Sequence, residues 1–383
     1  MKIAYIAAAQ IPSTRANSIQ VMKVCQALKQ NEHEVKLYVP GRSEHTWGEL
    51  TALYGLDTQF DIRWLHSWPP AHYLDFFIPA VNMSIKWEAD LIYTRMLQAA
   101  RTSAFYGYPT ILEMHEVPTG KHGPEHFKKF VHEPIRKLIV FITHSLRNLC
   151  EEQLGEKIPD EIVYVAPDGV DLERYAGLPD AATARNRLNL QDRFTLLYSG
   201  SFYQGRGMQM LFDLARQLTD KQFLWLGGKP GDVEEWRHKL NEAHIENVTL
   251  PGFVDNASLP AYQATADLLL MPYSNSVAGS SGGDIAKVTS PMKLFEYMAC
   301  GRAIITSDLP VLHEVLNDQN AVFCPPDDLD AWISSIQSLA TDDALRVRLG
   351  SQALKDVQQY SWRYRMQNIE VAWKLTEKRV RHE

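Results

Sequence analysis

The chain has few cysteines, and their spacing excludes two common kinds of site. Four occur among the 383 residues, and no two of them form a CxxC pair or a Cys/His pattern. Disulfide frameworks and zinc sites need such spacings, so we expect reduced core residues of a cytoplasmic protein. The four are Cys25, Cys150, Cys300 and Cys324.

Long apolar runs are also missing. No run approaches the roughly 18 residues of a membrane-spanning helix. The apolar run after Lys2 is too short for a signal peptide, so we interpret it as a first buried strand. We therefore expect membrane association, if the protein has any, to be peripheral contact with the inner face.

The chain also lacks a net positive charge and a glycine-rich turn after its first strand. The 39 basic and 46 acidic residues give a net charge of −7, which excludes a strong nucleic-acid footprint. The turn Ala9–Asn17 contains no glycine, so the GxGxxG fingerprint of a dinucleotide-dependent dehydrogenase is missing. We identify no cluster of histidines and carboxylates at metal-ligand spacing, and we expect no obligatory metal or cofactor.

Length and pattern predict two α/β domains. One core does not usually cover 383 residues. Short apolar runs alternate with helix-like segments in both halves, which is typical of doubly wound parallel sheets. We expect domains at 1–180 and 190–360, a polar linker at Gly177–Asp192 and a last segment at 361–383. The expected strands are Lys2–Ala8, Val35–Val39, Leu91–Tyr93, Thr110–Met114, Leu138–Ile142, Ile162–Val165, Phe194–Tyr198, Phe223–Gly227, Leu268–Met271, Ala303–Thr306 and Ala321–Cys324.

Pro40–Trp87 is less regular and rich in aromatic residues. Such a segment cannot be a simple crossover between two strands. We favour an extra core layer, and we keep two alternatives, a lining of an acceptor cleft and a contact with a membrane surface.

The stretch Gly279–Pro310 has the pattern of a ligand cradle. Ser290 is a good N-cap and Pro291 suits the first helical position, so we expect a helix here that ends before Gly301. Its unpaired N–H groups would form an anion site. Glu296 lies off the apolar stripe, where it could accept hydrogen bonds from sugar hydroxyls or be an ordinary solvated glutamate.

A second phosphate-binding pattern follows the strand that ends at Tyr198. The order is strand, glycine-rich turn, basic residue and amphipathic helix. Arg206 stands between Gly205 and Gly207, so its guanidinium could grip a diphosphate as a planar fork. The alternative is a surface arginine in a loop.

Polar residues also mark the ligand edge of the first sheet. Glu113 and His115 stand at a strand end, where ligands bind in parallel α/β sheets. A lone histidine is more often structural than functional, so both interpretations stay open. Arg15 and Asn17, in the glycine-free turn, are candidates for a phosphate or acceptor contact, or are surface groups.

One segment carries a family resemblance. SPMKLFEYMACGRAIITSDLP resembles the signature of retaining GT-B-fold glycosyltransferases of family 4, also called glycosyl transferases group 1. The resemblance implies two facing Rossmann-like doubly wound parallel sheets with an interdomain cleft, with the donor in the second domain and the last helix crossing back to the first from Ser361-Trp362. It implies that Glu296 holds the ribose and that His115, Arg206 and Lys293 serve catalysis. The implied donor-binding residues are Gly200, Ser201, Gly252, Phe253, Val288, Ser290, Pro291, Met292, Leu294 and Glu296.

The sequence departs from the family pattern at several positions. Val288 stands where a second Glu is usual, and Ser201 stands where an Arg is usual. Arg206 replaces a Lys. We expect Asp284, or backbone N–H groups between Val288 and Lys293, to take the place of the missing Glu.

The resemblance implies a retaining glycosyltransferase. It would move a hexose-like sugar from a UDP- or GDP-linked donor to a glycan, lipid-linked or small-molecule acceptor. Two alternatives are a nucleotide-sugar 2-epimerase of the same fold and a non-catalytic nucleotide-sugar-binding module. The expected partners are the donor and a carbohydrate or lipid-linked acceptor, with no nucleic acid, and with peripheral membrane contact through the first domain as a further hypothesis.

Overall fold

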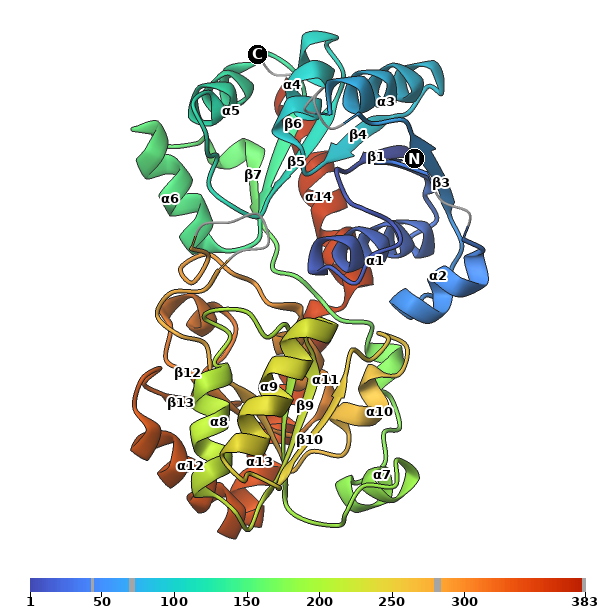
Figure 1. Ribbon diagram of the computed structural model, residues 1–383. Coiled ribbons are helices and arrows are strands. Elements are labelled where there is room, and N and C mark those ends of the chain that lie inside the picture. The colour runs from blue at the N-terminus through green and yellow to red at the C-terminus, as the bar shows by residue number, and fades with distance from the viewer. Residues whose placement is uncertain (43–44, 69–72, 279–283, 381–383) are drawn as a thin grey trace. The chain divides into compact units, whose positions relative to one another are not determined.

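The computed structural model describes residues 1–42, 45–68, 73–278 and 284–380. The chain divides into two compact units (Figure 1). The first unit comprises Met1–Asp168 and Trp362–Glu383, and the second comprises Gly169–Ser361. Each unit is built on one parallel β-sheet, as the sequence pattern predicts.

The first unit has a seven-stranded parallel sheet in the order β3-β2-β1-β4-β5-β6-β7. Within this sheet, the strands β4, β5 and β6 are buried at every position, as expected for parallel strands covered on both faces. The polar residues that follow β4, β5 and β7 therefore meet at one edge of the sheet. The strands are β1 (Lys2–Ile6), β2 (Glu34–Pro40), β3 (Asp61–Leu65), β4 (Leu91–Thr94), β5 (Thr110–Met114), β6 (Lys137–Phe141) and β7 (Val163–Val165).

Helices cover the sheet of the first unit, and the last helix of the chain is one of them. In Figure 1 the red α14 lies among the blue and cyan elements of this unit, and it contacts α1 and β6. The earliest and latest parts of the sequence thus share one core. The helices are α1 (Ala16–Gln30), α2 (Trp47–Tyr54), α3 (Leu74–Lys86), α4 (Leu97–Phe105), α5 (Gly123–His132), α6 (His144–Leu154) and α14 (Trp362–Val380).

The aromatic segment Pro40–Trp87 supplies the edge strand β3 and the helices α2 and α3. One face of α3 packs onto β1 and β2, where Phe76 and Ala80 belong to the apolar core. The segment therefore adds an edge strand and its two crossover helices to the sheet, in place of the expected extra core layer. The other face of α3 leaves Leu74 and Ile78 exposed. Within the described residues, no helix is both long and apolar enough to cross a membrane.

The second unit has a six-stranded parallel sheet in the order β10-β9-β8-β11-β12-β13. Neighbouring residues of β8 alternate between two apolar clusters, with Leu197 in one and Leu196 and Tyr198 in the other. Both faces of the sheet are therefore buried. The strands are β8 (Thr195–Gly200), β9 (Gln222–Gly227), β10 (Val248–Gly252), β11 (Leu268–Met271), β12 (Ala303–Ser307) and β13 (Val322–Cys324).

The helix predicted in the stretch Gly279–Pro310 is α11, and it starts one residue later than expected. Pro291, with φ −76° and ψ 123°, is the N-cap residue, so Ser290 does not cap the helix. The extended ψ of Pro291 keeps it outside the helical turn. Gly301 ends the helix at φ 67°, as predicted. The helices of this unit are α7 (Ala181–Arg187), α8 (Met208–Gln217), α9 (Pro230–Glu242), α10 (Leu259–Gln263), α11 (Met292–Cys300), α12 (Leu329–Thr341) and α13 (Asp343–Asp356).

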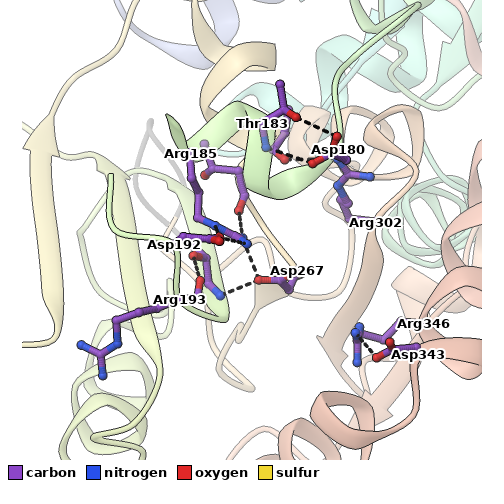
Figure 2. Close-up of polar contacts among 12 residues, drawn as sticks. Asp180, Thr183, Arg185, Asp192, Arg193, Asp267, Arg302, Asp343 and Arg346 are labelled. Atoms are coloured by element: carbon purple, nitrogen blue, oxygen red, sulfur yellow. Dashed lines mark hydrogen bonds and ion pairs between the residues drawn. The ribbon is translucent and has the colours of Figure 1, made fainter. Parts of the chain in front are cut away.

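The expected linker Gly177–Asp192 is an integral part of the second unit. It contains α7, whose Arg185 is nearly buried and forms ion pairs with Asp267 at 2.9 Å and Asp192 at 2.8 Å (Figure 2). Asp180 caps the helix by accepting a hydrogen bond from the backbone N–H of Thr183. These contacts explain why the first stretch of the first unit ends at Asp168 and not near residue 180.

Candidate functional site

Two half-buried cations with buried nitrogen atoms lie over the ring of Tyr273 in the second unit, Lys293 on α11 and Arg206 in the turn between β8 and α8. Lys293 stands in the first turn, and its ammonium group is 3.9 Å from the ring centroid of Tyr198. Among the described residues this ammonium has no hydrogen-bond partner. Arg206 packs against the rings of Tyr203 and Tyr273, and its Nη1 donates to the Tyr273 hydroxyl at 2.9 Å.

The charges of these two cations are not balanced by an ion pair. Within the described chain, neither Lys293 nor Arg206 forms a salt bridge with a carboxylate. Burial lowers the pKa of Lys293 well below its usual range, and the charge of Arg206 adds to this effect while Glu296 opposes it. Buried charges are normally paired, so this arrangement is suited to an anion that enters from outside the chain.

Glycines allow the close approach that this site needs. A Cβ on Gly200 would collide with the Lys293 ammonium, and a Cβ on Gly207 would collide with the carbonyl of Pro272. Both glycines have positive φ, 147° and 81°. Pro291, the N-cap residue of α11, makes no side-chain cap hydrogen bond to the N–H groups of the first turn, which also favours an anion there.

Glu296 lies one turn further along α11 and is held by a buried amide. The Nε2 of Gln263 donates to Glu296 at 3.3 Å and to Ser199 Oγ at 3.2 Å. The Oε1 of Gln263 accepts from the Tyr175 hydroxyl at 2.8 Å. Gln263 and Tyr175 were not among the residues predicted from sequence, because neither belongs to a recognisable motif.

Asp284 and Val288 make local contacts. The Asp284 carboxylate accepts from the backbone N–H groups of Val277 and Ala286, both at 2.9 Å, so it shapes its own loop. Val288 has a buried side chain, and its N–H donates to the carbonyl of Ile285 at 3.0 Å. The expected use of this N–H group in place of the missing Glu therefore loses support. Residues 279–283 of the predicted cradle lie outside the described residues.

The other predicted donor-binding residues lie in three places. Ser290 is nearly buried beside the α11 start, which consists of Pro291, Met292 and Leu294. The carbonyl of Ser201 accepts from the Tyr198 hydroxyl at 2.7 Å. Gly252 has φ 85°, and Phe253 after it is 44% exposed, which argues against core packing as the reason for an aromatic residue there.

In the first unit, Glu113 is the centre of a buried polar cluster. Its carboxylate accepts from the Gln20 amide at 2.6 Å, from the Tyr93 hydroxyl and from His115 Nε2 at 2.6 Å. Arg365 of α14 forms an ion pair with it at 3.2 Å. Burial alone would raise the pKa of Glu113, but Arg365 and the hydrogen bond from His115 outweigh it and hold the pKa well below its usual range.

His115 and Asp168 complete this cluster. Burial lowers the pKa of His115 to about 4, and the charge of Arg95 adds to the effect, so the ring is neutral at pH 7. Burial raises the pKa of the Asp168 carboxyl to about 7, although Arg365 opposes it. Sequence analysis missed Arg365 because it lies 252 positions from Glu113, and no local pattern links the two.

Glu113, His115 and Asp168 each offer a ligand atom, and these atoms lie within 4.8 Å of one another. This grouping was not visible from sequence spacing. A divalent cation would compete with Arg365 for the Glu113 carboxylate and would meet the second positive charge of Arg95. The donor set therefore fits a charge-balanced protein cluster better than a metal site.

Arg15 and Asn17 stand at the start of α1. Arg15 is the N-cap residue and is exposed, and the side-chain oxygen of Asn17 accepts a hydrogen bond from the Ser18 hydroxyl at 3.4 Å. Their predicted contacts with phosphate or acceptor stay predictions.

Comparison with known proteins adds to this geometry. Residues 193–342, which include Arg206, Lys293 and Glu296, match the glycosyl transferases group 1 family. The matched segment lies wholly within the second unit. The predicted family resemblance is confirmed.

Curated relatives of this chain include glycosyltransferases. The chain is 28% identical over 204 residues to a phosphatidyl-myo-inositol mannosyltransferase of Mycolicibacterium smegmatis, covering 51% of this chain and 47% of the relative. It is 23% identical over 238 residues to an alpha-galactosylglucosyldiacylglycerol synthase of Streptococcus pneumoniae, covering 58% and 59%. The chain thus spans about half the length of the curated relatives it matches.

The fold matches over nearly the whole chain. The crystal structure of HepE from Anabaena in complex with UDP aligns with a TM-score of 0.72 at 16% identity, covering 98% of this chain and 100% of that chain. The predicted fold class, a GT-B fold with two doubly wound parallel-sheet α/β domains, is confirmed.

Proposed function

We propose that this protein is a retaining glycosyltransferase that moves a hexose-like sugar from a UDP- or GDP-linked donor to a glycan, lipid-linked or small-molecule acceptor. The observation that carries the proposal is the half-buried pair Lys293 and Arg206, which has no carboxylate counter-ion among the described residues and lies within the segment that matches the family. A nucleoside diphosphate supplies the missing negative charge. The HepE structures with UDP and with UDP-glucose support this class of donor.

The two cations would act most strongly as the reaction proceeds. When the bond between the sugar and the diphosphate breaks, negative charge grows on the leaving phosphate. Donors already fixed in a buried site stabilise such charge without reorganisation. The entering anion would also favour protonation of Lys293, whose ammonium form is disfavoured without a partner.

The remaining site residues have supporting roles in this proposal. Glu296 would accept hydrogen bonds from the ribose hydroxyls, with Gln263 holding its carboxylate. His115 would contact the donor sugar. Gly252 and Phe253 would line the nucleobase, and the α11 start would bind the phosphates. No obligatory metal is part of this mechanism, because the two cations and the helix start already provide positive charge at the leaving group.

The acceptor and the location are also proposals. The names of two relatives contain phosphatidyl-myo-inositol and diacylglycerol, which favours a lipid-linked acceptor. The exposed Leu74 and Ile78 of α3 would suit peripheral contact with a bilayer. Sedimentation with anionic vesicles, comparing the wild type with Leu74→Ser/Ile78→Ser, tests this contact with a bilayer, and equal sedimentation of the two proteins would contradict it.

All four cysteines are free and buried, which favours a location in the cytoplasm.

The donor is identified by a panel of nucleotide sugars, first by thermal shift and then by transfer. A ligand at 100 times its Kd stabilises the folded protein by about 2.7 kcal/mol, which a thermal shift resolves.

Glu296→Gln should weaken the binding of the nucleoside diphosphate and the binding of the donor by the same factor. Transfer should persist in excess EDTA, and activity that only magnesium restores would contradict metal independence. Proton exchange at the sugar in deuterated water without acceptor would instead favour the 2-epimerase, and binding without any turnover would favour the non-catalytic module.

A further inference from the structure

The hydrogen bonds around Glu113 determine which nitrogen of His115 carries the proton. The Glu113 carboxylate is completely buried, and its oxygens receive hydrogen bonds from Gln20, Tyr93, His115 and Arg365. A carboxylate with so many donors stays ionised, and an ionised carboxylate can only accept. The contact of 2.6 Å with His115 Nε2 therefore requires an N–H on that nitrogen.

The second nitrogen of the ring is then an acceptor. The imidazole is neutral near pH 7, so a proton on Nε2 leaves a lone pair on Nδ1. Within the described residues, the bond to Glu113 is the one hydrogen bond of the His115 side chain. The side chain is 17% exposed, whereas that of Glu113 is 0% exposed. The ring thus has one end fixed in the protein and the other available.

We propose that Glu113 and Arg365 are positioning residues that fix the proton of His115 on Nε2, so that Nδ1 accepts a hydrogen bond from a hydroxyl group of the sugar substrate. This inference rests on the proposed function for the identity of the hydroxyl, but the tautomer itself follows from the cluster alone. His115 then recognises a hydroxyl donor, and it does not serve as a cation.

Arg365 has the geometry to keep Glu113 in this role. Its guanidinium is 3% exposed, donates to the carbonyls of Pro167 at 2.7 Å and Ala166 at 3.1 Å, and contacts both oxygens of Glu113. Five hydrogen-bonding groups on the guanidinium, arranged as a rigid fork, make such a multiple contact possible. The last helix of the chain thereby orients a side chain at the end of β5.

A relay from α1 fixes the other side of the carboxylate. Arg95 Nη1 donates to the Gln20 oxygen at 2.9 Å, so the Gln20 amide must turn its NH₂ group towards Glu113. The charged or titratable groups that face His115 are Glu113 on β5, Arg95 after β4, Asp168 after β7 and Arg365 on α14. The phenols of Tyr5 and Tyr93 complete the surroundings of Glu113.

The tautomer can be measured directly. Long-range ¹H–¹⁵N correlation spectra of the full chain, with ¹⁵N-labelled histidine, distinguish a ring protonated on Nε2 from one protonated on Nδ1. The His115 signals are assigned as those missing from His115→Gln. We expect a neutral Nε2–H ring at pH 7 that stays neutral down to pH 5. An Nδ1–H ring, or titration near pH 6.5, would overturn the inference.

Variants separate positioning from a merely structural role. Glu113→Gln should give a mixture of tautomers, because the amide can donate as well as accept, whereas the matched control Tyr93→Phe should keep the Nε2–H ring. If transfer is found, Glu113→Gln should lower kcat/KM for the donor by about 10- to 100-fold. It should add nothing in a His115→Ala background.

A Glu113→Gln protein with an unchanged His115 spectrum would overturn the inference, and so would additive losses of kcat/KM. If Glu113→Gln does not fold, the spectrum of the wild type still decides the tautomer. The spectrum is also independent of turnover. Failure of the proposed function and failure of this inference are therefore distinguishable.

Discussion

The two units treat buried charge in opposite ways. In the first unit, the Glu113 carboxylate is paired with Arg365 and surrounded by donors. In the second unit, the Lys293 ammonium and the Arg206 guanidinium lie half-buried among tyrosines and, in the described residues, have no carboxylate partner. One cluster is complete in itself, and the other has an excess of positive charge.

This difference indicates what each unit can bind. A cluster whose charges are balanced can still offer the neutral Nδ1 of His115, which suits a sugar hydroxyl. A cluster with unbalanced cations is costly without a ligand and gains most from an anion. Under the proposed function, the diphosphate would be bound by the second unit, and a sugar hydroxyl would be recognised by the first. The predictions below test this assignment, from the largest expected effect to the smallest.

The first prediction breaks the balance in the first unit. Arg365→Met leaves the buried Glu113 charge without its partner, so it should destabilise the protein by about 3–5 kcal/mol. The double variant Glu113→Gln/Arg365→Met removes both charges and should recover much of this loss. Urea unfolding followed by circular dichroism measures both. If Arg365→Met were as stable as the wild type, the pair would not be balanced as described.

The second prediction removes one cation from the second unit. Arg206→Ala should lower turnover by about 100- to 1000-fold and weaken donor binding less, because its contact strengthens as charge grows on the leaving phosphate. Arg206→Lys should recover part of the turnover. Steady-state kinetics with calorimetric binding of the donor separates the two effects. Intact turnover in Arg206→Ala would remove Arg206 from the mechanism.

The sequence predicted the second unit better than the first. The predicted site residues there lie within about ninety residues of one another: Arg206, Lys293 and Glu296. That part of the chain resembles a family and contains residues that predict where a helix starts and ends. In this segment the N-cap was misplaced, because Ser290 and Pro291 are both typical of helix starts and neighbouring residues cannot be ranked by preference alone. The expected linker Gly177–Asp192 was also wrong, since it belongs to the second unit.

The first unit depends on contacts between distant residues. Arg365 meets Glu113 because α14 returns to the first unit, and Gln20 meets it across 93 positions. No local periodicity encodes such pairs. The edge strand β3 escaped prediction for another reason, since its residues are only half-buried and carry no continuous apolar run.

The third prediction concerns the pH dependence of the first unit. The pKa of Asp168 is about 7 in the folded protein, above its ordinary value of 3.8, mainly because of burial. The folded state therefore keeps the Asp168 proton where the unfolded state has lost it, so the contribution of Asp168 to stability falls as pH rises from 4 to 7, whereas that of His115, whose folded pKa is about 4, rises up to about pH 6.5. Asp168→Asn should remove the falling contribution, so its stability relative to the wild type should increase from pH 4 to pH 8 and reach on the order of 2 kcal/mol. Unfolding curves of both proteins at several pH values measure this difference, and a difference that does not change with pH would contradict the assignment.

The most direct test of the unbalanced charge is calorimetric binding of a nucleoside diphosphate and its parent nucleoside to the wild type and to Lys293→Met. UDP with uridine and GDP with guanosine are the ligand pairs. The account predicts that the better diphosphate binds the wild type at least about tenfold more tightly than its nucleoside, a difference of about 1.4 kcal/mol, and that Lys293→Met loses most of this preference while remaining folded. A folded Lys293→Met protein that keeps the full preference for the diphosphate would contradict the account.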